Sequence, residues 1–152
     1  MNKNRLLKLA SFLENLPPKK FDLDTFTHIQ GNKLPSIKEG SCGSTACGIG
    51  WCPTVFPRLC KYQPLYDQYS YEDDIIIGVD IVMRDDSVIE GFFVSNELFD
   101  ILYDDSNYLF NPQCYHKSKR GPKSVANRIR TYVLADGKVP INTKAYRGDF
   151  DE

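Results

Sequence analysis

The chain has 152 residues and a mass of 17.4 kDa, with 41% hydrophobic and 26% charged residues and a formal net charge of −1. This length predicts one domain with its own core, and the composition excludes wholesale disorder, collagen-like repeats and a coiled coil. The near-neutral charge argues against a dedicated nucleic-acid binder, which carries a basic excess. No apolar run approaches the roughly 20 residues of a membrane span. We read no export signal in the N-terminal segment and expect a cytoplasmic protein.

The first predicted element is an amphipathic helix, Asn2–Leu16. Its leucines recur three and four positions apart, which is typical of a helix with one face in the core. Pro17 and Pro18 end it, because neither can donate to the helical ladder and Pro17 disfavours helical geometry in the residue before it. Residues 30–41 have the composition of a loop.

The next element is rich in cysteine and glycine and reads SCGSTACGIGWCP, residues 41–53. Its small side chains favour close approach of another backbone, and Gly43, Ala46 and Gly50 recur at helical spacing. We therefore predict a short buried helix, Ser44–Trp51, packed on the first helix and ended by Pro53 and Pro57.

Residues 75–94 change to β-branched composition. Ile75–Met83 and Val88–Val94 predict two strands of a hairpin, with turn chemistry at Arg84–Ser87 between them. An irregular helix over part of this segment is the alternative. A helix is predicted to begin at Ser95, with Leu98, Phe99, Ile101 and Leu102 as its apolar residues, and residues 107–121 read as a loop.

The last predicted helix is Lys123–Asp136, with Pro122 near its first turn and Gly137 as its C-terminal cap. The sequence thus predicts one small α+β domain, residues 1–141, in which about three to four helices pack around a short β-hairpin or small antiparallel sheet. Residues 142–152 are expected to form a flexible polar tail. The predicted core residues are Leu9, Leu13, Phe26, Trp51, Phe56, Ile129 and Val133.

The five cysteines are candidates for chemistry: Cys42, Cys47, Cys52, Cys60 and Cys114. Their number is odd and no Cys-x2-Cys pair occurs, so we expect packed thiols, no metal site and no other cofactor. The enzymatic alternative is a cysteine hydrolase or transferase. Its nucleophile would be Cys42, activated at the edge of the predicted helix, and its base would be His28 or His116.

The charges are distributed unevenly along the chain. Residues 67–105 hold twelve acids and one base, with tyrosines interleaved, whereas residues 117–130 hold six bases and no acid. Acid combined with tyrosine favours a surface that binds a basic protein partner. The predicted binding residues are Tyr66, Tyr69, Tyr71, Asp73, Asp74, Asp85 and Asp86. In the alternative, a nucleic acid or nucleotide binds to Lys119, Arg120, Lys123, Arg128 and Arg130, although a solvated helix face would have the same composition.

Three segments, in this order, carry a family resemblance: RLLKLASFLENLPPKKFDL, CGSTACGIGW and VANRIRTYVLADGKVP. They resemble a family of small bacterial and phage proteins marked by a leucine-rich N-terminal helix, the motif C-G-[ST]-x-A-C-x-x-G-[WH] and a late A-x-R-I…G helix. Trp51 stands here at a position that is often histidine. The resemblance implies a small cytosolic protein encoded by a phage or mobile element, and it implies no reaction. We therefore expect a non-enzymatic accessory protein that binds a host protein, such as an inhibitor of a host nucleic-acid or defence enzyme.

Overall fold

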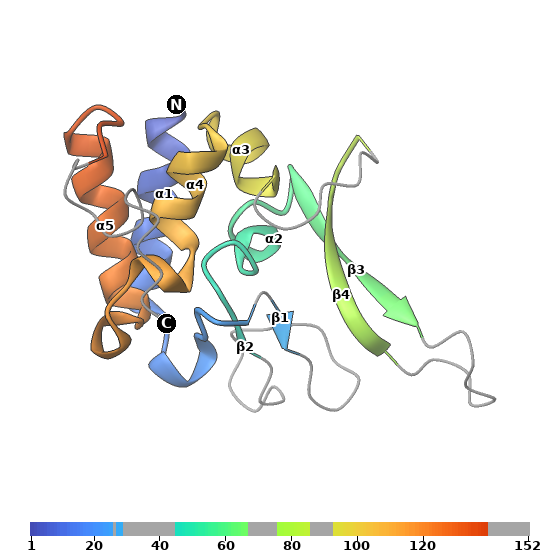
Figure 1. Ribbon diagram of the computed structural model, residues 1–152. Helices are drawn as coiled ribbons and strands as arrows, with labels where there is room; N and C mark the ends of the chain where they lie inside the picture. Colours follow the sequence, from blue (N-terminus) through green and yellow to red (C-terminus); the bar gives the residue numbers. More distant parts are fainter. Residues whose placement is uncertain (26, 29–44, 67–75, 86–92, 140–152) are drawn as a thin grey trace.

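The computed structural model describes residues 1–25, 27–28, 45–66, 76–85 and 93–139. Within these ranges five α-helices and two small antiparallel sheets form one α+β domain, as predicted. Figure 1 shows α1, α4 and α5 gathered in one helical body, with a two-stranded ribbon projecting to its side. None of the described helices combines the length and the apolar character that a membrane span needs.

The first and last helices form the centre of the helical body and confirm the sequence prediction. They are α1 (Lys3–Asn15) and α5 (Pro122–Leu134), and each packs more extensively on the other than on any other described helix. The Asn2 side chain caps α1 by accepting from the Arg5 N–H. Gly137 ends the turn after α5 with a positive φ of 80°, as expected for a glycine at this position.

The predicted helix Ser44–Trp51 is wrong. Thr45–Ala46 form strand β2, which pairs antiparallel with β1 (Thr27–His28), and the chain then turns into a shorter helix, α2 (Cys52–Val55). Pro53 lies in the first turn of α2 rather than at its end, because a first-turn proline loses no helical hydrogen bond. As predicted, the small residues allow close packing, but they lie in a turn and not in a helix. A Cβ added to Gly48 would lie 3.3 Å from the Phe110 ring.

The ribbon corrects the predicted hairpin. Strand β4 (Ile76–Met83) matches the predicted strand Ile75–Met83, but its partner is the earlier strand β3 (Cys60–Tyr66). Val94, expected in the second strand, lies in a helix, and residues 88–92 lie outside the described ranges. The Arg84 N–H donates to Leu59 O at 2.8 Å. Hydrogen-bonded and non-hydrogen-bonded positions alternate along an antiparallel pair, so Pro64 lies at a non-hydrogen-bonded position of β3. Its missing N–H therefore removes no hydrogen bond between β3 and β4.

The helix predicted to run through Leu102 is two helices, α3 (Phe93–Phe99) and α4 (Tyr103–Phe110), and α4 extends into the predicted loop 107–121. They are separated by Asp100, whose φ of 51° is left-handed and breaks the helical path. Two 3₁₀ turns in that predicted loop, η2 (Pro112–Cys114) and η3 (Lys117–Lys119), connect α4 to α5.

The core lies between the helical body and α2. Trp51 is fully buried, and its indole N–H donates at 3.1 Å to the O atom of Lys20, the last residue of the 3₁₀ turn η1 (Pro18–Lys20). The predicted core residues are buried where the structure describes them, whereas Phe26 and the predicted tail 142–152 lie outside the described ranges. The confirmed core residues are Leu9, Leu13, Trp51, Phe56, Ile129 and Val133.

Candidate functional site

The described thiols have the properties of packed side chains. Cys47, Cys52 and Cys60 are buried, and burial raises the pKa of Cys47 and of Cys60 from the ordinary value of 9.0 to about 11. Burial raises the pKa of Cys52 well above 9.0, with the nearby Cys60 and Cys47 thiols adding to the shift. Because the thiolate is the nucleophile, these three buried and protonated thiols are unsuited to nucleophilic catalysis. Cys42, the candidate nucleophile, lies outside the described residues.

The two candidate bases lie in different parts of the fold. His28 belongs to β1, opposite Thr45 of β2. His116 is the N-cap residue that precedes η3. Its Nδ1 lies 2.8 Å from Ser118 Oγ and accepts from the Ser118 N–H, so the ring caps this turn. In the part of the chain that the structure describes, no cluster of three or more histidine, cysteine or acidic side chains could hold a metal ion.

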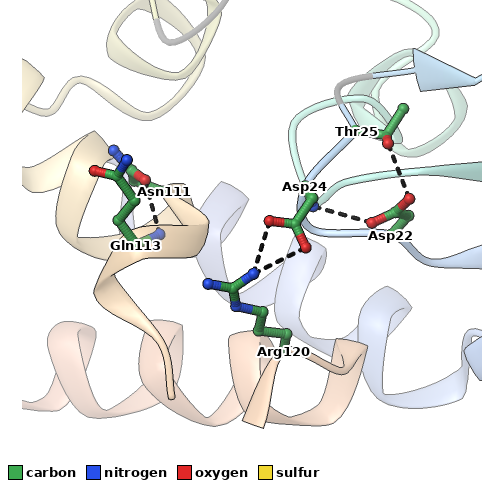
Figure 2. A network of polar contacts seen from close by, with 6 residues as sticks. All are labelled: Asp22, Asp24, Thr25, Asn111, Gln113 and Arg120. Carbon is green, nitrogen blue, oxygen red and sulfur yellow. Dashed lines mark hydrogen bonds and ion pairs between the residues drawn. The ribbon is translucent and has the colours of Figure 1, made fainter. Parts of the chain in front are cut away.

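The three arginines of the basic segment 117–130 bind groups of the protein itself, whereas its three lysines are exposed. Figure 2 shows Arg120, whose Nη1 lies 2.8 and 3.0 Å from the two carboxylate oxygens of Asp24. The Asp24 N–H and the Thr25 hydroxyl both donate to the Asp22 carboxylate, which orders this short segment. Arg130 on α5 forms a two-nitrogen ion pair with Glu14 on α1, at 2.7 Å for each contact.

Arg128 is also engaged internally. Its guanidinium donates to Tyr108 O at 2.8 Å and to Cys114 O at 2.7 Å, and it lies over the rings of Tyr108 and Tyr115. Of the five cations proposed for nucleic-acid binding, only Lys119 and Lys123 are exposed. The described arrangement therefore leaves few cations available for phosphates.

The predicted acidic and tyrosine-rich site is only partly described. Tyr66 is half-exposed at the end of β3, and Asp85 is exposed just after β4. Because β3 and β4 are antiparallel, with Cys60 opposite Met83, these two residues lie at opposite ends of the ribbon and do not form one site. The remaining predicted binding residues lie outside the described ranges: Tyr69, Tyr71, Asp73, Asp74 and Asp86.

Tyr62 on β3, which precedes the acidic segment 67–105, is a structural tyrosine. Its hydroxyl donates to Gly50 O at 2.7 Å and lies 3.4 Å from the Thr54 hydroxyl. Burial raises the pKa of this phenol above its usual range, so it remains a neutral donor.

The structure brings together a surface that the sequence prediction missed. Phe93 on α3 and Tyr103 on α4 have ring centres 5.8 Å apart, and Leu102 precedes Tyr103. All three side chains are exposed, Leu102 by 75%. Glu97, one helical turn after Phe93, and Asp104, in the first turn of α4, are exposed beside them. We call these five residues the α3–α4 corner.

No simple signal in the sequence marks the α3–α4 corner. Leu102 continues the apolar spacing of Leu98 and Phe99, which are buried, so a continuous helix would place it in the core. It is exposed because Asp100 turns the chain and α4 begins in a new direction. The residue with the left-handed φ is an aspartate, whereas a glycine at this position would have indicated the break in the helix from the sequence alone.

None of the family models, curated proteins or solved structures compared with the chain matches it. The resemblance to the bacterial and phage family therefore stays a prediction, and the chemistry of the described side chains is the basis for the function proposed below.

Proposed function

We propose that this protein is a non-enzymatic binding protein that recognises a basic surface of another protein. It would act in the cytoplasm as an accessory factor of a phage or mobile element, directed at a host protein. The α3–α4 corner is the observation that supports this proposal, because it combines exposed apolar side chains with carboxylates that have no ion-pair partner among the described residues.

Both components suit protein recognition. Negatively charged carboxylates attract a basic surface, and this attraction acts over about 8 Å at physiological salt and raises the association rate. Aromatic side chains act as anchors, since they bury a large area and lose little conformational entropy when they are covered. Phe93 and Tyr103 have this character, and Glu97 and Asp104 supply the charge.

The other two functional classes have less support. A cysteine enzyme needs a thiolate, and its candidate nucleophile Cys42 lies outside the described residues. The described thiols offer no substitute, since they are buried or, for Cys114, partly buried with a pKa that burial raises. Phosphate binding needs several available cations, and Arg120, Arg128 and Arg130 already bind a carboxylate or carbonyl groups of this chain.

The proposal is tested by selecting ligands from a displayed random-peptide library, with duplex DNA and single-stranded RNA measured in parallel. Selected peptides are expected to carry excess lysine and arginine. Their association with the protein should slow as salt rises through about 0.15 M, while dissociation changes less. Neither nucleic acid should bind with comparable affinity.

Paired charge variants provide the control. Glu97→Lys with Asp104→Lys should abolish binding of the selected basic peptides, whereas Lys119→Glu with Lys123→Glu should leave it unchanged. If the protein instead binds nucleic acid, and the lysine pair abolishes that binding, the nucleic-acid alternative is correct. Selection of peptides without a basic excess would contradict the proposal.

A further inference from the structure

We infer that the α3–α4 corner is a docking surface, and that its occupant is a cationic protein segment which places an apolar side chain against Phe93, Leu102 and Tyr103. This inference rests on the proposed function and deepens it, because it names the surface and the chemistry of the segment that binds there.

The apolar part of the corner is formed by side chains from two helices. Phe93 is 57% exposed, Leu102 75% and Tyr103 48%. The Phe93 and Tyr103 rings lie against each other with an interplanar angle of 35°. Large apolar side chains exposed next to one another typically mark an interaction site, whereas a single exposed apolar residue needs no such explanation.

The corner is held in place by hydrogen bonds between its helices and to α1, and the one between Ser95 and Ser106 is buried. The Ser95 hydroxyl on α3 donates to Ser106 Oγ on α4 at 2.7 Å, and the Ser106 hydroxyl donates to Asn96 Oδ1 at 2.6 Å. Arg5 of α1 donates to Leu98 O, and Asp105 Oδ2 accepts from the Leu102 N–H at the start of α4. A surface that is already ordered in this way loses little conformational entropy when it binds a partner.

The charge of the corner selects the class of occupant. Glu97 and Asp104 are exposed beside the apolar side chains, and neither takes part in an ion pair within the part of the chain that the structure describes. A second copy of this chain, docked through the same surface, would bring like carboxylates together. An anionic membrane would repel them as well. A segment that carries lysine or arginine beside an apolar residue satisfies both parts of the surface.

The inference is tested with three synthetic peptides of one length. The first has lysines and serines around a central tryptophan, the second replaces the tryptophan by alanine, and the third keeps the tryptophan and replaces every lysine by glutamate. Binding to the ¹⁵N-labelled protein is followed by NMR chemical-shift changes. We expect the first peptide to shift amides of residues 93–105, the second to bind about ten-fold more weakly, and the third not to bind.

Substitutions then separate this surface from other exposed apolar residues. Leu102→Ser and Tyr103→Ser should each weaken binding of the tryptophan peptide by about ten-fold, the effect of losing a central anchor. Leu134→Ser on α5 and Leu65→Ser on β3 remove side chains that are 87% and 39% exposed, and they should leave the affinity unchanged. Thermal melting of each variant verifies that the fold is intact.

The possible outcomes distinguish the two proposals. If lysine peptides bind with strong salt dependence but Leu102→Ser and Tyr103→Ser bind as the wild type does, the docking surface is wrong and the proposed function stands. If lysine and glutamate peptides bind equally or neither binds, both are wrong. A dimer in sedimentation, or binding to phosphatidylserine vesicles, that Leu102→Ser abolishes would assign the corner to a second copy or to a membrane.

Discussion

The guanidinium of Arg128 lies 3.5 Å from the centre of the Tyr115 ring, and the same group lies 4.8 Å from the centre of the Tyr108 ring. Its nitrogens also donate to Tyr108 O and Cys114 O, so one α5 side chain joins α4 to the segment that follows it. Tyr115 is itself fixed by a hydrogen bond from its hydroxyl to Leu109 O. Arg128 therefore holds together a connection that contains little regular secondary structure.

Replacing Arg128 should destabilise the domain. Arg128→Met removes two hydrogen bonds from a charged donor and the contact with two rings, and should lower the free energy of unfolding by about 2–4 kcal/mol in urea denaturation. Arg128→Lys should recover only a small part, because an ammonium group cannot stack on the rings and bond both carbonyls. Lys123→Met, at an exposed position of α5, should change stability by less than about 0.5 kcal/mol. Equal effects of Arg128→Met and Lys123→Met would contradict this role.

Gly48 should not tolerate a methyl group. A Cβ at this position would lie 3.3 Å from the Phe110 ring and 3.6 Å from Leu13 Cδ1, and both neighbours are buried and cannot move aside easily. Gly48→Ala is therefore expected to cost about 1–3 kcal/mol of unfolding free energy. Gly121 has no atom within 4 Å of an added Cβ and precedes α5. Gly121→Ser should be neutral or stabilising by about 0.5 kcal/mol, because its hydroxyl can cap the helix. A stable Gly48→Ala variant would contradict the close approach.

The ion pair between α1 and α5 should make stability depend on pH in the acid range. The hydrogen bond from Arg130 holds the pKa of Glu14 below its ordinary value of 4.5. A lowered pKa in the folded state stabilises the protein above the unfolded pKa, and this contribution is lost as the pH falls through the folded pKa. In urea titrations at a series of pH values, Glu14→Gln should therefore flatten the decline in stability below about pH 5. Identical pH profiles for the wild type and Glu14→Gln would contradict this contribution.

The buried thiols should react only after the protein opens. Alkylation of native protein, followed by mass spectrometry, is expected to label Cys114 before Cys47, Cys52 and Cys60, and denaturant should remove the difference. Since burial raises the folded pKa of Cys47 and Cys60 from 9.0 to about 11, the folded state holds these protons more tightly. Their contribution to stability is complete below the unfolded pKa and declines as the pH rises from 9 toward 11. Rapid labelling of Cys52 in the native protein would contradict this picture.

The two long helices were predictable because each buries one continuous apolar face. In α1 the leucines recur at helical spacing, and in α5 Val125, Ile129 and Val133 do the same. The C-terminal end of α5 was predictable only in part: Gly137 has the left-handed φ that glycine allows, but the chain already leaves the helix at Asp136, whose φ is 54°. In both helices the face that the apolar spacing of the sequence predicts is the face that is buried in the fold.

The remaining elements depend on contacts that are distant in sequence. Strand β4 was predicted from its β-branched residues, but its partner β3 contains Lys61, Gln63 and Pro64 and shows no strand signal. In the cysteine-rich segment, the close approach of Gly48 to Phe110 and the pairing of β2 with β1 override a weak helical spacing. Asp100 breaks the predicted helix without a glycine, and that break is what exposes the α3–α4 corner.

The roles of the arginines were also beyond the sequence pattern. A run of six bases without an acid suggested a surface for phosphates, yet the acids that bind Arg120 and Arg130 are Asp24 and Glu14, about a hundred positions earlier in the chain. Arg128 instead donates hydrogen bonds to backbone carbonyl groups and lies over aromatic rings. A charge count along the chain cannot detect such pairs, because folding and not sequence distance brings them together.

The pairing of α1 with α5 has a consequence for how the protein is made. Residues 16–121 are synthesised between these two helices, so α1 leaves the ribosome long before its main partner exists. During that interval Leu6, Leu9 and Leu13 have no α5 to cover them. The helical body can therefore form only after translation has passed Leu134, and a nascent chain arrested earlier would present these leucines to chaperones and proteases.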